Sequence, residues 1–148
     1  CSEGNSEKCL KYDIMNIIYK NTHNFSKKEL EELFLFFFWS SGQFPEKLVT
    51  AMKNYDSVYS AWDGDELVGL ISAMDDGIMN VYINYLLVKP EYQLKGIGKN
   101  LVEKVKQHYR DYDRITVVTL YEKSRFYEYC GFEKREDKVP LFITTLED

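Results

Sequence analysis

Residues 57–88 carry the feature that most restricts what this chain can fold into: three segments of β-type sequence in succession, separated by two turn signals. Side chains from Val58 to Trp62 alternate at strand spacing. Asp63-Gly64 is a strong signal for a two-residue hairpin turn, and a second glycine turn follows at 75–77. Connections this short reverse the chain between neighbours, so we expect an antiparallel meander. Its strands are expected at 57–62, Leu67–Met74 and Met79–Val88.

Helical patterns flank the meander on both sides. Ser26 and Glu29 have the spacing of a capping box, which predicts a helix that runs to about Trp39. Pro45 favours the first turn of a second helix. Apolar residues recur at helical spacing over 97–109, which predicts a third helix. The remaining expected elements are a first strand within 11–19, a β run over Ile115–Leu120, a short helix over Glu122–Cys130 ended by Gly131, a strand that begins at Phe132 and a last strand over Val139–Leu146.

This order of elements predicts the α/β (α+β) class, with a single mixed, mostly antiparallel twisted sheet flanked by helices. The chain has 148 residues, of which 45% are hydrophobic, so it is long enough for one domain with a substantial core. We expect a flexible polar tail at 1–10 and a single domain over 11–148.

The charge and cysteine content exclude several classes of protein. A net charge of -5 repels nucleic-acid phosphates, so DNA or RNA binding is not expected. The three cysteines are odd in number and lack metal-ligand spacing, which argues against a disulfide scaffold or a zinc site and favours a reducing, cytoplasmic location. Because the cysteines lack metal-ligand spacing, no metal is expected. No apolar run approaches the roughly 18 residues of a membrane span, so we expect no membrane partner.

The stretch from Gln93 to Gly98 leads directly from the predicted strand into the predicted helix. Gly96 and Gly98 permit close approach to the backbone, and the first turn of a helix offers unpaired N–H groups, a combination suited to an anion such as phosphate. Lys95 and Lys99 add positive charge. The alternative is that the glycines only shape a tight connection. The segment matches neither a P-loop nor the dinucleotide-binding fingerprint, which needs a third glycine where Leu101 stands.

Two motifs here resemble those of the GCN5-related N-acetyltransferases (the GNAT family). The family pattern Q/R-x-x-G-x-G/A after a strand is filled by Gln93, Gly96 and Gly98. The segment Phe126-Tyr127-Glu128-Tyr129-Cys130-Gly131-Phe132 is similar to the family's F-Y-x-x-x-G-F element. The resemblance covers roughly 26–135, and it implies a GNAT-like acyl-CoA N-acyltransferase fold.

The resemblance also implies roles for particular residues. Acetyl-CoA would be the acetyl donor, with its pantetheine arm lying in a cleft between two splayed strands and its pyrophosphate held by a turn of backbone amides. Tyr127 resembles the family tyrosine that protonates the leaving thiolate. The short link from Leu120 to Phe126 departs from many relatives, and Ser124 is the candidate to replace a cofactor contact there. The implied cofactor-binding residues are Leu86, Leu87, Val88, Gln93, Leu94, Lys95, Gly96, Ile97, Gly98, Lys99 and Ser124.

Some residue roles, the acceptor and the overall function have alternative interpretations. A packing role for the Tyr127 ring is the alternative to its acid role. Cys130 is expected in the core and not as a nucleophile, and His108 is expected in a structural role. His23 has no visible partner. The acceptor is expected to be a small-molecule or peptide amine. The sequence does not identify the general base that would remove the proton of this amine. A non-catalytic acyl-CoA sensor or protein-interaction module of the same fold is the competing function. The predicted last strand, Val139–Leu146, would lie at an exposed end of the sheet and could pair with another subunit, so a homodimer is predicted.

Overall fold

The computed structural model describes residues 16–37 and 40–146. The predicted tail at 1–10 and most of the predicted first strand lie outside these ranges. Short 3-10 turns occur at Ser40–Gln43 (η1), Pro90–Tyr92 (η2) and Tyr121–Lys123 (η3). The helices and strands, in chain order, are β1 (Ile17–Lys20), α2 (Lys27–Leu35), α3 (Pro45–Asn54), β2 (Ser57–Asp63), β3 (Glu66–Asp75), β4 (Asn80–Val88), α4 (Ile97–His108), β5 (Arg114–Val117) and α5 (Ser124–Tyr129).

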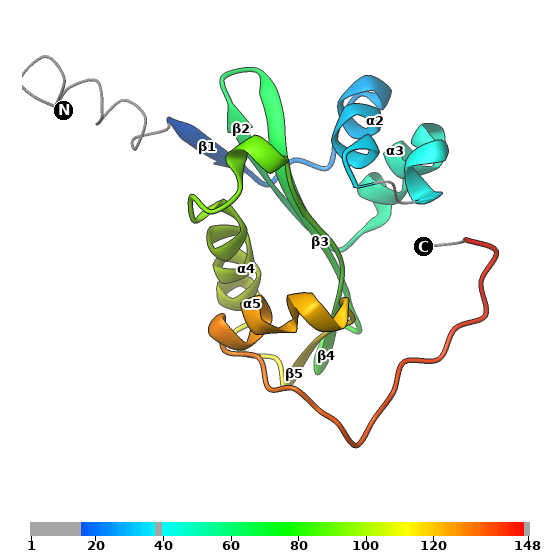
Figure 1. Ribbon diagram of the computed structural model, residues 1–148, viewed down its shortest axis with the longest axis vertical. Helices are drawn as coiled ribbons and strands as arrows, with labels where there is room; N and C mark the ends of the chain where they lie inside the picture. Colours follow the sequence, from blue (N-terminus) through cyan, green and yellow to red (C-terminus); the bar gives the residue numbers. More distant parts are fainter. Residues whose placement is uncertain (1–15, 38–39, 147–148) are drawn as a thin grey trace, which may run out of the picture.

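The five strands form one sheet in the order β1-β2-β3-β4-β5. Neighbours from β1 to β4 pair antiparallel, whereas β5 runs parallel to β4. The helices α4 and α5 lie on one side of the sheet and α2 with α3 on the other (Figure 1). The predicted mixed, mostly antiparallel α+β sheet flanked by helices is therefore confirmed, including the meander of β2, β3 and β4.

Each face of the sheet has its own core. Val68, Ile71 and Val81 pack with Leu101 and Val105 of α4 on one face. On the other face α2 and α3 supply buried side chains to a second cluster. The α4-side cluster includes residues from both the central strands and the helix that follows the glycine turn, so it fixes that turn at the end of β4.

The first helix begins as predicted but ends early. Ser26 Oγ accepts a hydrogen bond from the Glu29 backbone N–H at 3.0 Å, and Glu29 Oε1 accepts one from the Ser26 N–H at 2.9 Å, which completes the capping box. The helix stops at Leu35, not near Trp39, because Phe37 N–H donates to the Phe34 carbonyl at 3.1 Å and tightens the chain into a 3-10-type turn.

Two predicted C-terminal strands are absent from the described residues. Neither the segment from Phe132 nor Val139–Leu146 pairs with any described strand, and both predictions are wrong for this structure. β5 is also shorter than expected and ends at Val117, because its partner β4 turns away beyond Ile83. The predicted short helix is divided into η3 and α5, and Gly131 ends it with a φ of 104°, as expected of a helix-ending glycine.

Candidate active site

A β-bulge in β4 opens the sheet at the predicted cleft. Ser72 of β3 lies opposite Tyr85, whereas Ala73 lies opposite Ile83, so β4 carries one extra residue, Asn84. The pairing between β4 and β5 stops at the same place, since Ile83 opposite Val117 is its last pair. From Asn84 to Val88 the β5-facing edge of β4 therefore has no strand partner among the described residues.

Strand alternation decides which backbone groups line that open edge. Lys89 N–H donates to the Val68 carbonyl at 2.8 Å, so its backbone faces β3. Backbone direction alternates along a strand, so Leu87 also faces β3, whereas Leu86 and Val88 direct their N–H and C=O groups to the open edge. The Val88 carbonyl accepts a hydrogen bond from Gln93 Nε2 at 2.9 Å, in agreement with this direction. Of the three strand residues in the predicted cofactor set, Leu86 and Val88 thus supply backbone groups to the cleft.

The turn that follows β4 presents unpaired amides. Gly96 is the N-cap of α4 with a φ of 88°, and its carbonyl accepts from the Asn100 N–H at 2.9 Å. The N–H groups of Ile97, Gly98 and Lys99 precede this first intrahelical bond, so they have no partner within the helix. They lie at the positive end of the helix dipole, which makes the turn suitable for an anion.

Leu94 adds a strained, fully exposed position to the same turn. Its φ is 62°, and it is the one non-glycine residue with positive φ among those described. Its side chain is 105% exposed and thus gains nothing from burial there. Backbone strain of this kind occurs most often at functional sites, because the surrounding structure has to impose it.

Tyr127 lies on α5, half-buried between two aromatic rings. Its ring centroid is 5.1 Å from that of Phe126 and 5.6 Å from that of Phe132, both edge-on. Its hydroxyl has no hydrogen-bond partner among the described residues. Burial, with a smaller contribution from the nearby Cys130 thiol, raises the pKa of Tyr127 to about 12. The phenol therefore stays protonated at neutral pH and is able to donate a proton or a hydrogen bond.

Contacts between α4 and α5 bring the two sequence motifs together. A side-chain carbon added at Gly98 would lie 3.4 Å from the Phe126 ring and 3.8 Å from Val88, so the glycine faces the space between the end of β4 and α5. Lys106 of α4 donates to the Cys130 carbonyl at 2.8 Å and holds the other end of α5. Ser124 begins α5, but its hydroxyl donates to the Tyr121 carbonyl at 2.8 Å.

On the α3 side of the cleft, polar and aromatic side chains gather at the bulge. Asn84 donates a short hydrogen bond to the Tyr55 hydroxyl, and Tyr85 donates to Ser41 Oγ at 2.9 Å. The rings of Tyr55 and Tyr85 lie 6.4 Å apart. Burial and the neighbouring Tyr55 raise the pKa of Tyr82. Tyr55 and Ser41 could not be predicted from the sequence, because nothing local connects them to this strand.

The extra residue in β4 left a sequence signal that was also missed. Val81 and Ile83 face the α4-side core, and after them Leu86 and Val88 do so. The inward positions therefore change from odd to even numbers between 83 and 86. A shift in the hydrophobic alternation marks a bulge, since one added residue rotates every later side chain to the other face.

The two histidines and Cys130 make contacts that hold the fold together and lie outside the predicted cleft. His108 Nδ1 lies 2.8 Å from the Tyr59 hydroxyl on the α4 surface, and His23 Nδ1 lies 2.9 Å from the Met52 carbonyl, a partner not visible in the sequence. Cys130 is buried in the core. No cluster of His, Cys, Asp or Glu suited to a metal occurs within 16–37 and 40–146.

Neither of two surface hollows coincides with the cleft. One of about 470 Å³ is lined by Lys20, Trp62 and Asp65, and another of about 400 Å³ lies beside Glu32 and Leu67. Both are near α2 and the β2–β3 turn. The predicted cleft at β4 is therefore defined by the backbone geometry and not by a closed cavity.

Among the described helices, none combines the length and the apolar character of a membrane span.

A family model and individual relatives both match this chain to acetyltransferases. The acetyltransferase (GNAT) domain family matches residues 24–140. The uncharacterized N-acetyltransferase ycf52 of Pyropia yezoensis is 28% identical over 138 residues, covering 88% of this chain and 78% of that protein. The GCN5-related N-acetyltransferase 2, chloroplastic, of Arabidopsis thaliana is 35% identical over 95 residues, or 58% of this chain. The chain covers only 37% of the length of that Arabidopsis protein.

Solved structures share the fold. A GNAT family acetyltransferase from Streptococcus pneumoniae TIGR4 superposes with a TM-score of 0.74 at 26% identity, over 87% of this chain and 98% of that one. A putative acetyltransferase from Deinococcus radiodurans R1 gives 0.72 at 21% identity, over 88% and 89% of the two chains. The second likeness is one of fold alone.

Proposed function

Because the chain belongs to the GNAT acetyltransferase family, we propose that it transfers an acetyl group from acetyl-CoA to a primary amine by direct attack in a ternary complex. The observation that carries the proposal is the combination at the end of β4. The strand loses its partner at the Asn84 bulge and leads into a turn whose first helical amides are unpaired.

The donor side of the proposal assigns binding to backbone groups. Leu86 and Val88 offer N–H and C=O groups at the open edge of β4 for the amides of the pantetheine arm. The amides from Leu94 to Lys99 would hold the pyrophosphate, with added charge from Lys95 and Lys99. Gln93 supports this arrangement indirectly, because its side chain ties the turn to the Val88 carbonyl at 2.9 Å.

Acetyl-CoA supplies an activated thioester whose carbonyl is open to attack by a neutral amine. The Leu86 N–H, next to the bulge, is our candidate for the donor that stabilises negative charge on the carbonyl oxygen. Tyr127 is the candidate to protonate the departing thiolate, since its phenol is kept neutral by burial. Ser124 enters the proposal only as an acceptor of hydrogen bonds, because its hydroxyl proton is directed at Tyr121.

The proposed acceptor site is the wall on the α3 side of the bulge. Tyr55, Tyr82 and Asn84 meet there, and each carries a polar atom on an otherwise apolar or aromatic surface. Such a wall suits a small amine or a peptide side chain with some apolar character. None of these three side chains is a carboxylate or a histidine, so we propose that a water molecule takes the amine proton.

One assay distinguishes this function from a non-catalytic acyl-CoA sensor of the same fold. Acetyl-CoA binding is measured by calorimetry, and thiol release is followed with a panel of aralkyl, polyamine, aminoglycoside and peptide amines. We expect binding on the order of micromolar and amine-dependent thiol release, with the acetylated amine identified by mass spectrometry. Binding without turnover for every amine would favour the sensor, and no binding at all would exclude both.

The pH dependence of turnover is a further expected result. The rate should rise with pH as the acceptor amine loses its proton, and it should not fall again before about pH 10, because Tyr127 has its pKa raised to about 12 and remains a proton donor. Initial rates at saturating acetyl-CoA, with thermal melting at each pH as a stability control, measure this. A fall in kcat near neutral pH without loss of folded protein would rule out Tyr127 as the acid.

Two further properties belong to the proposal. A cytoplasmic location stays a prediction from the cysteine content, and one relative is named as chloroplastic. A homodimer is likewise proposed, and gel filtration with light scattering on the purified chain measures it.

A further inference from the structure

The turn proposed to hold the pyrophosphate is attached to the hairpin of β2 and β3. An acidic residue stands on each side of the hairpin turn, Asp63 at the end of β2 and Glu66 at the start of β3. Asp63 Oδ2 accepts a hydrogen bond from the Tyr92 hydroxyl at 2.6 Å. Glu66 Oε2 forms an ion pair with Lys89 Nζ at 3.0 Å. Two carboxylates of one hairpin thus hold the segment 89–93, which leads from β4 into the turn.

Tyr92 is fixed at both ends of its side chain. Its ring is 9% exposed and belongs to the α4-side core, as do Val88 and Ile97. Its hydroxyl donates to a carboxylate, which makes the bond short and strong. This hydrogen bond to Asp63, together with burial, raises the pKa of Tyr92 to about 12, so the phenol remains a donor at neutral pH. The residue therefore joins the hairpin to the core beside the turn.

The turn itself has a conformation that its own residues do not favour. Leu94 has a φ of 62°, although its side chain is fully exposed. A leucine keeps this left-handed conformation only where the surrounding structure imposes it. The chain is held before Leu94, where Gln93 Nε2 donates to the Val88 carbonyl at 2.9 Å. It is held again after Leu94, where Ile97 is buried. The attachments at 89–93 thus supply one of the two fixed ends that the turn requires.

Lys89 differs from the two other lysines near the turn. Its side chain is 8% exposed, and its ammonium group pairs with Glu66 and lies 5.6 Å from the Phe36 ring centre. Lys95 and Lys99 are exposed. The charge of Lys89 is therefore committed to the hairpin, whereas the charges of the other two lysines are available to an anion.

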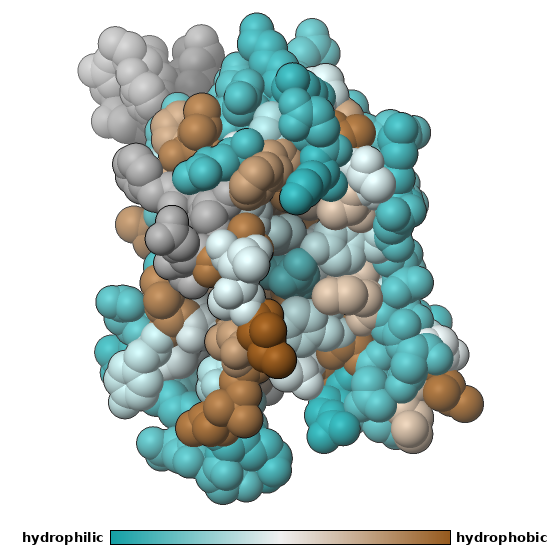
Figure 2. All heavy atoms as spheres, turned by 90° about the vertical axis from the view of Figure 1, so that its right-hand side faces the viewer, coloured by the Kyte–Doolittle hydropathy of each residue, from teal (hydrophilic) through white to brown (hydrophobic). Residues whose placement is uncertain are grey.

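The charge around the hairpin is opposite to what an anion site requires. Figure 2 shows hydrophilic side chains over the upper end of the molecule, where α2 lies. Four carboxylates of α2 and the hairpin line one hollow there, namely those of Glu29, Glu32, Asp65 and Glu66. Each negative charge weakens the binding of an anion nearby. Attraction to the ligand therefore does not explain Asp63 and Glu66, whereas their bonds to the segment 89–93 do.

We infer that the β2–β3 hairpin positions the turn 94–99 for acetyl-CoA. Asp63 acts through Tyr92. Glu66 acts through Lys89. A turn that is already ordered loses less conformational freedom when the ligand binds, which increases affinity without an added contact. The inference rests on the proposed function, because acetyl-CoA is the ligand, and it adds positioning residues from a hairpin that is distant in the sequence.

Tyr92→Phe tests the attachment by removing one hydroxyl. We expect the Kd of acetyl-CoA, measured by calorimetry, to rise roughly 10-fold, because the ligand then has to order the turn. The KM for acetyl-CoA should rise with it, whereas kcat at saturating acetyl-CoA should stay unchanged, since the bound turn is the same in both proteins. A loss of folded protein would instead lower kcat and leave KM unchanged.

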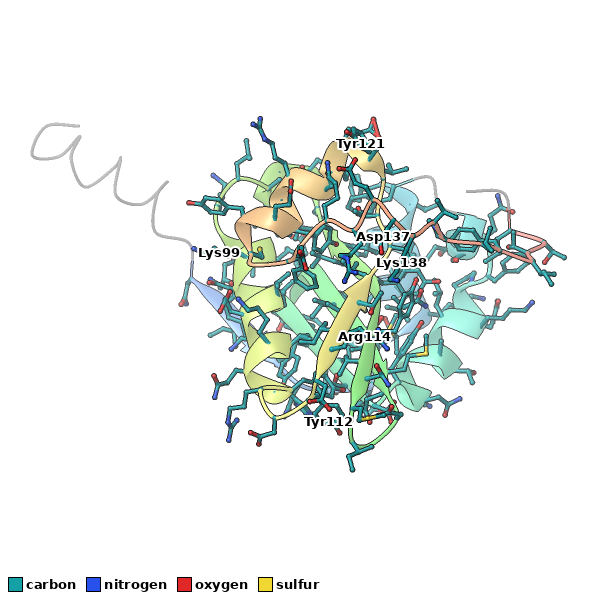
Figure 3. The ribbon with its side chains drawn as sticks, turned by 90° about the horizontal axis from the view of Figure 1, so that it is seen from below. Lys99, Tyr112, Arg114, Tyr121, Asp137 and Lys138 are labelled. Atoms are coloured by element: carbon teal, nitrogen blue, oxygen red, sulfur yellow. The ribbon has the colours of Figure 1, made fainter. Side chains whose placement is uncertain are left out.

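Tyr109→Phe provides a control of the same chemistry. Tyr109 is 2% exposed in the same core, and its hydroxyl donates to Asp75 Oδ2 at 2.8 Å and lies 2.8 Å from Ser57 Oγ. Figure 3 labels Lys99 at the start of α4 and Tyr112 beyond its opposite end. Tyr109 lies with Tyr112, at 4.9 Å between ring centres, and thus far from the turn. The variant should bind acetyl-CoA like the parent.

Removal of a hairpin carboxylate distinguishes position from charge. Asp63→Ala should weaken acetyl-CoA binding about as much as Tyr92→Phe, and the double variant should be no weaker, because both changes remove one bond. Asp65→Asn removes an exposed carboxylate that has no hydrogen bond or ion pair with any described residue, so it should not weaken binding. Tighter binding by Asp63→Ala would show an effect of charge alone and would overturn the inference.

NMR on the full chain without ligand examines the turn directly. Backbone order parameters at 94–96 should be about 0.85 in the parent and in Tyr109→Phe, and should fall to about 0.6 or below in Tyr92→Phe. A parent chain that binds no acetyl-CoA would overturn the proposed function and this inference with it. If the parent binds, and Tyr92→Phe binds equally tightly or keeps a turn as rigid as the parent's, only the inference is overturned.

Discussion

Tyr127→Phe is expected to lower kcat by roughly 100-fold or more and to leave acetyl-CoA affinity unchanged. The substitution removes only the hydroxyl, which has no partner among the described residues, and it keeps the ring that packs edge-on against Phe126 and Phe132. Folding stability should therefore change little. Steady-state rates by thiol release, together with calorimetric binding of acetyl-CoA, give the two quantities separately.

The matched control is Tyr129→Phe, on the same helix. Tyr129 is 79% exposed, so loss of its hydroxyl should affect neither rate nor binding. Equal rate losses in the two variants would point to a general effect on α5. An active Tyr127→Phe enzyme would leave Tyr127 as a packing residue, and the thiolate would have to be protonated by water or another group.

Gly98→Phe is expected to weaken acetyl-CoA binding by at least about 100-fold. A side chain at this position starts 3.4 Å from Phe126 and 3.8 Å from Val88, and a phenyl ring would fill the space between the end of β4 and α5 that the pantetheine arm is proposed to cross. Gly98→Ala should bind far better, because its added carbon makes only ordinary van der Waals contacts. Calorimetry on both variants measures the difference.

A second phenyl ring elsewhere on α4 controls for effects on the helix. Gln107 is exposed near the other end of α4, and Gln107→Phe should bind acetyl-CoA like the parent. Circular dichroism and melting temperature establish that each variant is folded. If a folded Gly98→Phe protein binds as tightly as the parent, the glycine only shapes the connection, and the proposed donor site lies elsewhere.

Features set by a few adjacent residues could be predicted from the sequence. The capping box at Ser26, the proline that begins α3 and the hairpin turn at Gly64 all appear as expected, since each depends on hydrogen bonds or φ values within one turn of chain. The resemblance of Gln93–Gly98 and Phe126–Phe132 to family motifs then indicated the fold as a whole.

Features that depend on distant partners were missed. The end of β5 at Val117 follows from the divergence of β4, which lies some thirty positions earlier in the chain. Val139–Leu146 has the composition of a strand, but a strand forms only where an edge accepts it, and this segment pairs with no described strand. Likewise Tyr55 reaches Asn84 only through the packing of α3 against the sheet.

The unpaired backbone of β4 also bears on how such a domain changes over time. Substitution of a side chain leaves main-chain N–H and C=O groups in place. The proposed acetyl-CoA site therefore tolerates many substitutions as long as the bulge and the turn persist. The wall formed by Tyr55, Tyr82 and Asn84 consists of side chains, and single codon changes remodel it. Directed evolution toward a new amine should therefore accumulate changes on that wall, while the strand end and its glycine turn stay as they are.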